Sequence, residues 1–328
     1  MAMQVIEVRR DWFTRRVSII APARGKRPNL IETSPPSVQR NCPFCPGNEG
    51  MTPPAQMVAV STGQGVQFRF DREAAVTKKW NVRVFPNMFP AFSSDPSVPG
   101  LSYGHHLVVV ESPNHAKDFN RLSPEEMDIY LKVLRSQVLR LNQDPKVNCI
   151  SVFKNYGEDA GASISHPHTQ IIASKMVPPV LQTEVEEYAA AWRREGASAI
   201  SLLAGEAEKG QRIVLRERSH VAFVPFAPMS PLELWIAPEE PTQPFEEDDE
   251  LECLGDLLRI LISGVKKMRG DVAYNLYFHL PPRNVERFHW HIEVVPRVNK
   301  FGGYELGFGA YIITVSPEDA AQLYRQAL

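Results

Sequence analysis

The spacing of apolar and polar positions predicts a strand–helix–strand–strand unit in the first half of the chain. Residues 105–111 are a run of mostly apolar residues rich in valine, which predicts a buried strand. Apolar positions then recur at helical spacing after Ser123, which opens a capping box with a proline in the first turn. Two further strand-like runs follow at 149–155 and 166–173, with a polar loop between them.

The second half of the chain runs through the same order of elements. A strand is predicted at 233–238, an acidic run opens an amphipathic helix, and strands follow at 274–280 and 288–296. Each copy ends in an H-x-H pair. We therefore expect an α+β fold built from a duplicated unit. Its pseudo-equivalent halves, 1–175 and 176–328, should each be an antiparallel sheet with packed helices.

Composition narrows the classes of function. The 328 residues are 43% hydrophobic and 23% charged, so the chain can bury a full core. A formal net charge of −2 gives no global field to recruit nucleic acid or a membrane surface, and neither is expected as a partner. No apolar run reaches the roughly 18 residues that span a membrane, and the N-terminus lacks the apolar core of a signal peptide. A cytoplasmic protein is expected.

The four cysteines favour metal chemistry over a disulfide framework, which is unusual in a chain of this size in a reducing compartment. Cys149 and Cys253 lie in apolar segments and are expected to be buried. Cys42 and Cys45 form a C-x-x-C inside the turn NCPFCPGN. A redox C-x-x-C normally opens a helix after a strand, whereas proline and glycine follow here, so a metal site is favoured.

The stretch SISHPHTQ places two histidines in one predicted strand. Alternate residues of a strand face the same way, so His166 and His168 should point together. Pro167 has a fixed φ and no backbone N–H, which predicts an extended segment at a sheet edge. Two core histidines bonded to the backbone are the simpler alternative, although pairing them in a core leaves several ring nitrogens to satisfy.

The functional interpretation gives the two histidines different tasks. Zinc in a structural site takes four nitrogen or sulfur ligands. Cys42, Cys45, His115 and His166 would form a closed Cys2His2 site that ties the N-terminal turn to the sheet. A closed site is structural, and its effect would be to fix the backbone of the strand that carries His168.

His168 is then available as a nucleophile. A neutral imidazole can attack phosphorus and leave afterwards, which splits one transfer into two displacements. Gln170 shares its face of the strand, and an amide can hydrogen-bond a phosphoryl oxygen without delivering a proton. This pair favours a transferase over a histidine-triad hydrolase. The preceding loop, which includes Gly161 and Ser163, can cradle phosphate oxygens.

These motifs together resemble the galactose-1-phosphate uridylyltransferases of the histidine-triad superfamily, with the related ADP-glucose phosphorylases. The family pattern is matched by six stretches: C-P-F-C-P-G, S-P-N-H, F-K-N with G-A-S, H-P-H-T-Q, PARGKRP and KFGGYELGFGAY. The resemblance therefore covers nearly the whole chain. It implies two histidine-triad-like halves, the first with zinc site and nucleophile and the second contributing to the hexose-phosphate site. It also implies a homodimer that binds a nucleotide sugar and a hexose 1-phosphate.

The resemblance implies a ping-pong reaction through His168. UDP-glucose leaves UMP on the histidine and releases glucose 1-phosphate, and galactose 1-phosphate then takes the UMP. Gln170 matches the amide that hydrogen-bonds the phosphoryl group, and no redox cofactor is needed. The positions that match substrate contacts are Arg24, Arg27, Asn87, Asn155, Gly161, Ser163, Lys300, Phe301, Tyr304 and Glu305. Without the resemblance, the two arginines equally suit a solvated basic turn, and the last two residues suit ordinary strand positions.

The chain departs from the family pattern at a second metal site. Some relatives hold a metal there with one glutamate and three histidines. The matching positions here are Glu184, His279, His291 and Glu293, with His289 as a further candidate. Glutamate is an acceptable ligand for Zn²⁺ or Fe²⁺. A degenerate copy of the active site, whose polar residues pack or face water, is the equal alternative.

The sequence indicates the type of reaction more closely than it indicates the substrate. The segment GGYELGFGAYI also resembles ADP-glucose phosphorylases, which transfer AMP to phosphate and often have serine between the two histidines. Pro167 favours the uridylyltransferase. Uridylyl transfer is therefore the first interpretation and adenylyl transfer the alternative. A non-enzymatic, zinc-stabilised module that binds nucleotide sugars is the third.

Overall fold

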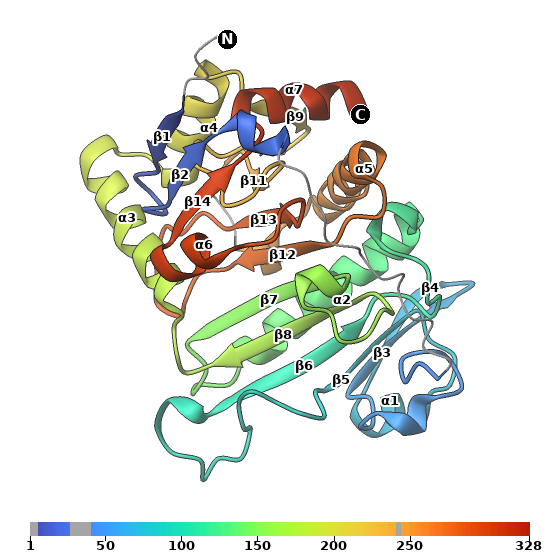
Figure 1. Cartoon of the computed structure of the whole chain (residues 1–328). Coiled ribbons are helices and arrows are strands. Elements are labelled where there is room, and N and C mark those ends of the chain that lie inside the picture. The colour runs from blue at the N-terminus through green and yellow to red at the C-terminus, as the bar shows by residue number, and fades with distance from the viewer. Residues whose placement is uncertain (1–5, 27–40, 241–243) are drawn as a thin grey trace.

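The computed structural model of the chain describes residues 6–26, 41–240 and 244–328. An 11-stranded sheet runs through the molecule, and its neighbouring strands pair antiparallel (Figure 1). Its order is β4 (Gly65–Phe70), β3 (Met57–Thr62), β5 (Val82–Pro86), β6 (Gly104–Val110), β8 (His168–Ser174), β7 (Cys149–Tyr156), β12 (Tyr274–His279), β13 (His291–Pro296), β11 (Leu234–Pro238), β10 (His220–Phe223) and β9 (Ile213–Glu217). A smaller sheet joins β1 (Glu7–Arg10), β2 (Val17–Ile20) and β14 (Ala310–Ile313).

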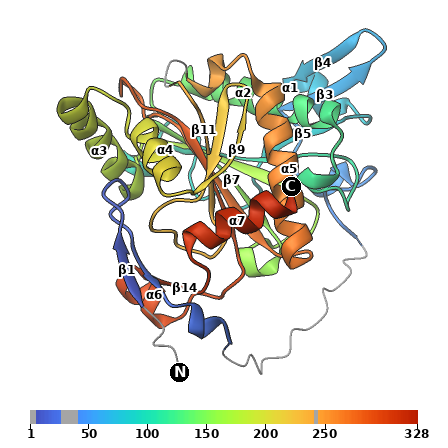
Figure 2. The ribbon, with the colours of Figure 1, turned by 90° about the horizontal axis from the view of Figure 1, so that it is seen from above.

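Helices cover both faces of the large sheet. The helices of the described residues are α1 (Asp71–Val76), α2 (Pro124–Asn142), α3 (Pro179–Glu195), α4 (Ala199–Lys209), α5 (Leu251–Arg269), α6 (Gly303–Phe308), which contacts β14 of the small sheet, and α7 (Pro317–Ala327). α2 and α5 lie side by side on one face and bury the main apolar core, and α7 lies against α5 (Figure 2). α3 and α4 pack on the opposite face of the C-terminal strands. No helix in the described ranges is long and apolar enough to cross a membrane.

The predicted duplication is visible in the topology. The order β6, α2, β7, β8 in the first half recurs as β11, α5, β12, β13 in the second. The two copies meet where β7 pairs antiparallel with β12, and Asn155 stands opposite Asn275 in that register. Strand order on one side of this junction mirrors the order on the other. The α+β prediction is confirmed, while the division at residues 175 and 176 stays a prediction.

The predicted start of the long helix in the first half is confirmed. Ser123 Oγ accepts a hydrogen bond from the Glu126 N–H, and Glu126 Oε2 accepts one from the Ser123 N–H. This capping box satisfies two of the backbone donors that a helix start leaves unpaired. In the second half, the acidic run ends at Glu250, and α5 begins at Leu251. Cys149 and Cys253 are buried, as expected from their apolar surroundings.

The predicted placement of the first histidine pair at a sheet edge is wrong. β8 lies inside the sheet between β6 and β7, and its ladder begins at His168, which pairs with Val110. His166 and Pro167 come before the strand, so the missing N–H of the proline removes no ladder hydrogen bond. β13 likewise begins at His291 instead of at residue 288.

Alternation along β8 separates an apolar face from a chemical face. Ile171 and Ala173 belong to the main core under α2. His168 and Gln170 therefore point to the opposite face, because successive side chains of a strand alternate. On that face the turn that contains Phe44 packs against Val108 and neighbouring apolar residues in a separate cluster.

The N-terminal hairpin crosses to the second half of the molecule. β1 and β2 pair with each other, and β2 pairs with β14 near the C-terminus. β1, β2, β14 and α6 gather on one side of the molecule (Figures 1 and 2). Phe13, in the turn of the hairpin, is completely buried beside Tyr188 of α3 and Trp235 of β11. This packing brings Arg16 to the C-terminal strands.

Candidate active site and metal centres

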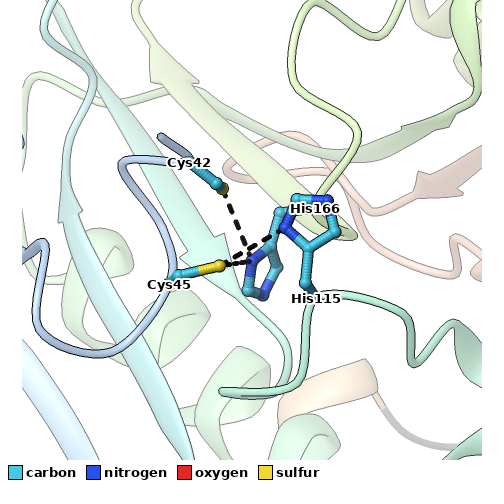
Figure 3. A group of neighbouring side chains, drawn as sticks. All are labelled: Cys42, Cys45, His115 and His166. Atoms are coloured by element: carbon cyan, nitrogen blue, oxygen red, sulfur yellow. Dashed lines mark hydrogen bonds between the residues drawn. The ribbon is translucent and has the colours of Figure 1, made fainter. Parts of the chain in front are cut away.

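The four residues predicted to bind the first metal lie together (Figure 3). Cys42 and Cys45 come from one turn, and His115 and His166 approach from two other segments. Their ligand atoms all lie within 4.8 Å of one another. The sulfur–nitrogen separations are 3.4 Å from Cys45 to His115, 3.6 Å from Cys45 to His166 and 3.7 Å from Cys42 to His166. Tetrahedral zinc with its usual bond lengths holds a sulfur ligand and a nitrogen ligand about 3.6 Å apart, so the residues fit zinc.

Hydrogen bonds outside the cluster fix which histidine nitrogens face the sulfurs. His166 Nε2 donates to the Ser112 carbonyl at 2.8 Å, so Nδ1 carries the lone pair that points to the cysteines. His115 Nε2 lies 3.0 Å from Ser165 Oγ. Burial and the neighbouring Cys42 raise the pKa of the Cys45 thiol to about 11. A thiolate at Cys45 therefore needs a cation beside it.

His168 is held as a neutral imidazole. The side chain is only 6% exposed, and its Nδ1–H donates to the His166 carbonyl at 2.8 Å. Because a carbonyl oxygen only accepts, Nε2 is left with its lone pair free. Burial lowers the pKa of His168 to about 4, so the imidazole is uncharged at neutral pH. Phe44, from the cysteine turn, packs edge-on against the ring at 5.1 Å between centroids.

Gln170 lies two residues from His168 and belongs to a side-chain network. Its Oε1 lies 2.9 Å from His106 Nε2 on β6 and 3.5 Å from Asn87 Nδ2. Asn87 was predicted from the resemblance to contact nucleotide, and the structure brings it to Gln170. The network leaves the Gln170 NH2 group as the donor that can face a phosphoryl oxygen.

The loop between β7 and β8 has the shape that its glycines require. Gly157 has φ +83°, and a Cβ there would lie 2.7 Å from the Ala273 side chain. Gly161 has φ +86°, in the left-handed region that suits glycine. Gly161 and Ser163 are exposed. The Gly161 N–H donates to the Glu158 carbonyl at 2.8 Å, so the Ser163 hydroxyl is the exposed polar side chain of this pair.

Asn155, at the end of β7, is oriented from the other half of the molecule. Asn275 Nδ2 donates to Asn155 Oδ1 and to the Ala160 carbonyl, at 2.8 Å each. The Asn155 oxygen is thereby occupied, and its own NH2 group is the part available to a ligand. The same hydrogen bonds fix the position of the 3-10 helix Glu158–Ala160 within the loop.

Part of the C-terminal segment reaches this loop. Lys300 Nζ lies 2.9 Å from Asp159 Oδ1, and Arg297 contacts the Asp159 carbonyl at 3.4 Å. Phe301 packs under the Arg297 guanidinium, whose carbon lies 4.1 Å from the ring centroid. The structure therefore brings Lys300 and Phe301 to the predicted phosphate loop, as the resemblance implied for a hexose-phosphate segment.

Tyr304 and Glu305 lie further along, in α6, so the alternative that they are strand residues is wrong. Tyr304 is half-exposed and packs on Phe308, and Glu305 accepts a hydrogen bond from the Gly302 N–H at 2.9 Å. Arg24 is exposed in the 3-10 helix Pro22–Lys26. This helix follows β2 of the small sheet along the chain, whereas His168 lies on β8 of the large sheet. Arg27 lies outside the described residues.

The second predicted cluster also forms and is completely enclosed. Ligand atoms of Glu184, His279, His291 and Glu293 lie within 4.8 Å of one another, and all four residues are buried. His279 Nδ1 lies 2.9 Å from both Glu184 oxygens. Both ring nitrogens of His291 lack a hydrogen-bond partner although the residue is fully buried. A buried imidazole without partners is costly, and a metal ion would satisfy one of its two nitrogens.

Arg16 is an additional member of this cluster. Its guanidinium contacts both oxygens of Glu293, at 2.8 and 3.0 Å, and lies 2.9 Å from Glu233. Against the effect of burial, Arg16 holds the pKa of Glu293 well below its usual range. Arg16 thus pairs with Glu233 and Glu293, whereas Glu184 contacts His279, and a divalent cation among the four ligands would add positive charge beside these buried carboxylates. These residues fit a second metal.

His289 is not part of this cluster. Its Nδ1 lies 2.8 Å from Ser198 Oγ, and its Nε2 donates to the Pro238 carbonyl at 2.7 Å. The arrangement repeats that of His166, whose Nε2 bonds the Ser112 carbonyl and whose Nδ1 faces Cys42. His289 is thus the second-half counterpart of a first-site ligand, with a serine hydroxyl where the first half has a thiol.

Comparison with known proteins places the chain in a family. The family DUF4921, described as a domain of unknown function, matches residues 101–328, and the chain belongs to it. The ADP-glucose phosphorylase of Arabidopsis thaliana is 31% identical over 98% of this chain and 92% of its own length. The chain is a member of the galactose-1-phosphate uridylyltransferase family, which includes the ADP-glucose phosphorylases. It is therefore a nucleotidyltransferase.

A uridylyltransferase and a crystal structure add to this comparison. The galactose-1-phosphate uridylyltransferase of Thermotoga maritima is 24% identical over 98% of both chains. A crystal structure of the Arabidopsis thaliana ADP-glucose phosphorylase with bound ADP-glucose matches with a TM-score of 0.82 and 29% identity, covering 98% of this chain and 99% of that one. The histidine-triad-like architecture expected from the family resemblance is confirmed.

The sequence did not indicate several residues that contact and position the predicted site residues. Phe44 lies between the two cysteines, and its place in the C-x-x-C was the available signal. Asn275 is the second residue of β12, the strand that repeats β7, so the internal repeat pointed to it. His106 and Arg16 carried no local signal, because each meets its partner only through strand pairing or through the crossing of the N-terminal hairpin.

Proposed function

We propose that this nucleotidyltransferase works through a covalent nucleotidyl intermediate on His168. The Nε2 lone pair attacks the α-phosphorus of a nucleotide sugar, a phosphorus–nitrogen bond forms, and the hexose 1-phosphate leaves. A phosphate oxygen of the acceptor then attacks the same phosphorus and the phosphorus–nitrogen bond breaks. The observation that carries the proposal is the Nδ1 bond to the His166 carbonyl, which fixes a neutral imidazole with Nε2 free.

ADP-glucose is the first candidate donor, with inorganic phosphate as acceptor. AMP would pass to His168 and then to phosphate, which yields glucose 1-phosphate and ADP. The 31% identity to an ADP-glucose phosphorylase supports this choice over the 24% identity to a uridylyltransferase. The structural match to a complex with ADP-glucose supports it as well.

Uridylyl transfer between UDP-glucose and galactose 1-phosphate is the second candidate. It rests on Pro167 between the histidines and on the uridylyltransferase relatives. The same His168 and Gln170 serve both reactions, because the chemistry takes place at the α-phosphate and not at the base. Asn155, Gly161, Ser163 and Lys300, together with Asn87, Arg24, Arg27, Phe301, Tyr304 and Glu305, remain the proposed substrate contacts.

Zinc is proposed for Cys42, Cys45, His115 and His166. It would cross-link the cysteine turn to the segment just before β8. This site supplies structure: it holds Phe44 against the nucleophile ring. A second Zn²⁺ or Fe²⁺ is proposed for the enclosed cluster of Glu184, His279, His291 and Glu293. A cytoplasmic homodimer is proposed from the family pattern alone.

Single-turnover labelling tests the proposal. The protein is mixed with ADP-glucose or, separately, with UDP-glucose without acceptor, and its intact mass is measured together with the released sugar phosphate. An AMP adduct supports the first candidate, and a UMP adduct supports the second. Binding of both nucleotide sugars without any adduct or released sugar phosphate would favour a non-enzymatic binding module and contradict the proposal.

A further inference from the structure

Two backbone N–H groups set the direction of hydrogen bonding around Gln170. The Ala91 N–H donates to His106 Nδ1 at 3.1 Å. The Phe89 N–H donates to Asn87 Oδ1 at 2.8 Å. A backbone N–H is always a donor, so these two contacts fix the role of each side chain that receives them.

For His106, the consequence is a single tautomer. Nδ1 accepts from Ala91 and carries the lone pair, so in a neutral ring the proton sits on Nε2. Nε2–H then donates to Gln170 Oε1 at 2.9 Å. Burial lowers the pKa of His106, which keeps the ring neutral near pH 7.

For Asn87, the same reasoning fixes the amide. Its oxygen accepts from Phe89, so its NH2 group faces Gln170 Oε1 at 3.5 Å. The two donor nitrogens of His106 and Asn87 lie 3.3 Å apart and converge on that one oxygen. Two donors on one side leave the Gln170 side chain only one favourable orientation, with its NH2 group turned the other way.

We infer that His106 is a positioning residue that acts through Gln170. It holds the amide so that the NH2 group, and not the oxygen, faces the phosphoryl group at His168. This inference rests on the proposed function and deepens it. A flipped amide would present lone pairs to the negative phosphoryl oxygens, which repel them, and the donor that stabilises the transition state would be lost.

The neighbouring residue provides a matched control. His105 lies on the opposite face of β6, and its Nε2 contacts Asp144 at 2.8 Å, away from the catalytic face. His105→Gln is expected to leave adduct formation unchanged. His106→Phe keeps a ring and removes both nitrogens. His106→Gln offers an oxygen to Ala91 and an NH2 group to Gln170, so it should restore most of the lost rate.

The decisive experiment is a double-mutant cycle on single-turnover adduct formation with ADP-glucose, or with UDP-glucose if that is the donor. Gln170→Met should slow the reaction about 100-fold, the usual effect of removing one donor to a developing oxyanion. His106→Phe should slow it at least tenfold with little change in nucleotide-sugar Kd. In the Gln170→Met background, His106→Phe should slow it no further. A similar slowing in both backgrounds would overturn the inference.

A measurement on the unmodified protein keeps the test independent of folding and activity. Nitrogen-15 NMR of the histidine rings reports the tautomer, with His106 assigned by comparison with the His106→Gln variant. The neutral Nε2–H form is expected. An Nδ1–H form or a charged ring at pH 7 would overturn the inference. A wild-type protein without any adduct would instead contradict the proposed function, while the tautomer would still decide the role of His106.

Discussion

Asn275 Nδ2 donates a 2.8 Å hydrogen bond to Asn155 Oδ1 and so joins the two halves of the molecule beside the proposed phosphate loop. The bond spans the junction between β7 and β12, where the duplicated units meet. A second bond from the same nitrogen reaches the Ala160 carbonyl inside the loop. The second half therefore contacts the proposed phosphate loop through Asn275.

Replacing Asn275 should slow nucleotidyl transfer although the residue is outside the proposed substrate contacts. In Asn275→Asp, a carboxylate faces two oxygens to which it cannot donate, so Asn155 loses its fixed orientation. We expect adduct formation to slow about tenfold, which corresponds to about 1.4 kcal/mol in the barrier. Stopped-flow mixing with intact-mass detection measures the rate. Asn142→Ser, which removes an exposed bond to Glu246, is the control and should have no effect.

Removing a ligand of the first cluster should cost metal and stability. Cys42→Ser is expected to lower zinc content by one equivalent per chain and to lower the melting temperature. Adduct formation should slow as well, because Phe44 loses its support against His168. Elemental analysis and calorimetry measure the first two effects. Cys149→Ser alters a buried cysteine outside the cluster and should leave zinc content unchanged. Equal zinc in Cys42→Ser and wild type would refute the assigned ligands.

How far the sequence predicts this site depends on the range of each interaction. The C-x-x-C turn and the shared face of His168 and Gln170 were predictable, because turn chemistry and alternation along a strand are local. The exact start of β8 was missed, since pairing of Val110 with His168 and not with an earlier residue depends on β6. Arg16 was unpredictable: its meeting with Glu293 requires the N-terminal hairpin to pack on the C-terminal strands. The internal repeat predicted the sheet junction but not the Asn155–Asn275 bond.

The second cluster should hold a divalent metal ion. Glu184→Gln removes one charge and a ligand, and it should lower the total metal content by one equivalent while Cys42, Cys45, His115 and His166 keep theirs. Metal analysis of wild type and variant after exhaustive dialysis measures this. If wild-type protein holds a single metal equivalent per chain, and Glu184→Gln holds the same amount, the second cluster would instead be a degenerate, metal-free copy of the active site.

Arg16 should matter for stability whichever metal is present. Arg16→Met leaves Glu233 and Glu293 buried without their common partner, and breaking such a buried pair costs about 3–5 kcal/mol. Urea unfolding of both proteins at pH 7 measures the difference. Arg15→Met, which removes exposed contacts to Glu186 and Glu187, should change stability by less than about 1 kcal/mol. Similar losses in the two variants would contradict the assigned role.

The pKa of His168 predicts the acid limit of adduct formation. An ordinary histidine with pKa near 6.5 would lose its nucleophilic form below that pH. Burial lowers the pKa of His168 to about 4, so the neutral form persists as pH falls from 8 to about 5 and is lost below that. The single-turnover rate should be flat over that range, with circular dichroism confirming that the protein stays folded. A rate that halves near pH 6.5 would contradict a buried nucleophile.

The central claim is tested most directly by locating the covalent group. The protein is quenched during a single turnover with ADP-glucose and, in parallel, UDP-glucose, digested near neutral pH and analysed by tandem mass spectrometry. The account predicts one nucleoside monophosphate on His168, and no adduct in His168→Ala protein that retains its zinc and melting behaviour. Release of sugar phosphate without an adduct, or an adduct on another residue that survives His168→Ala, would contradict it.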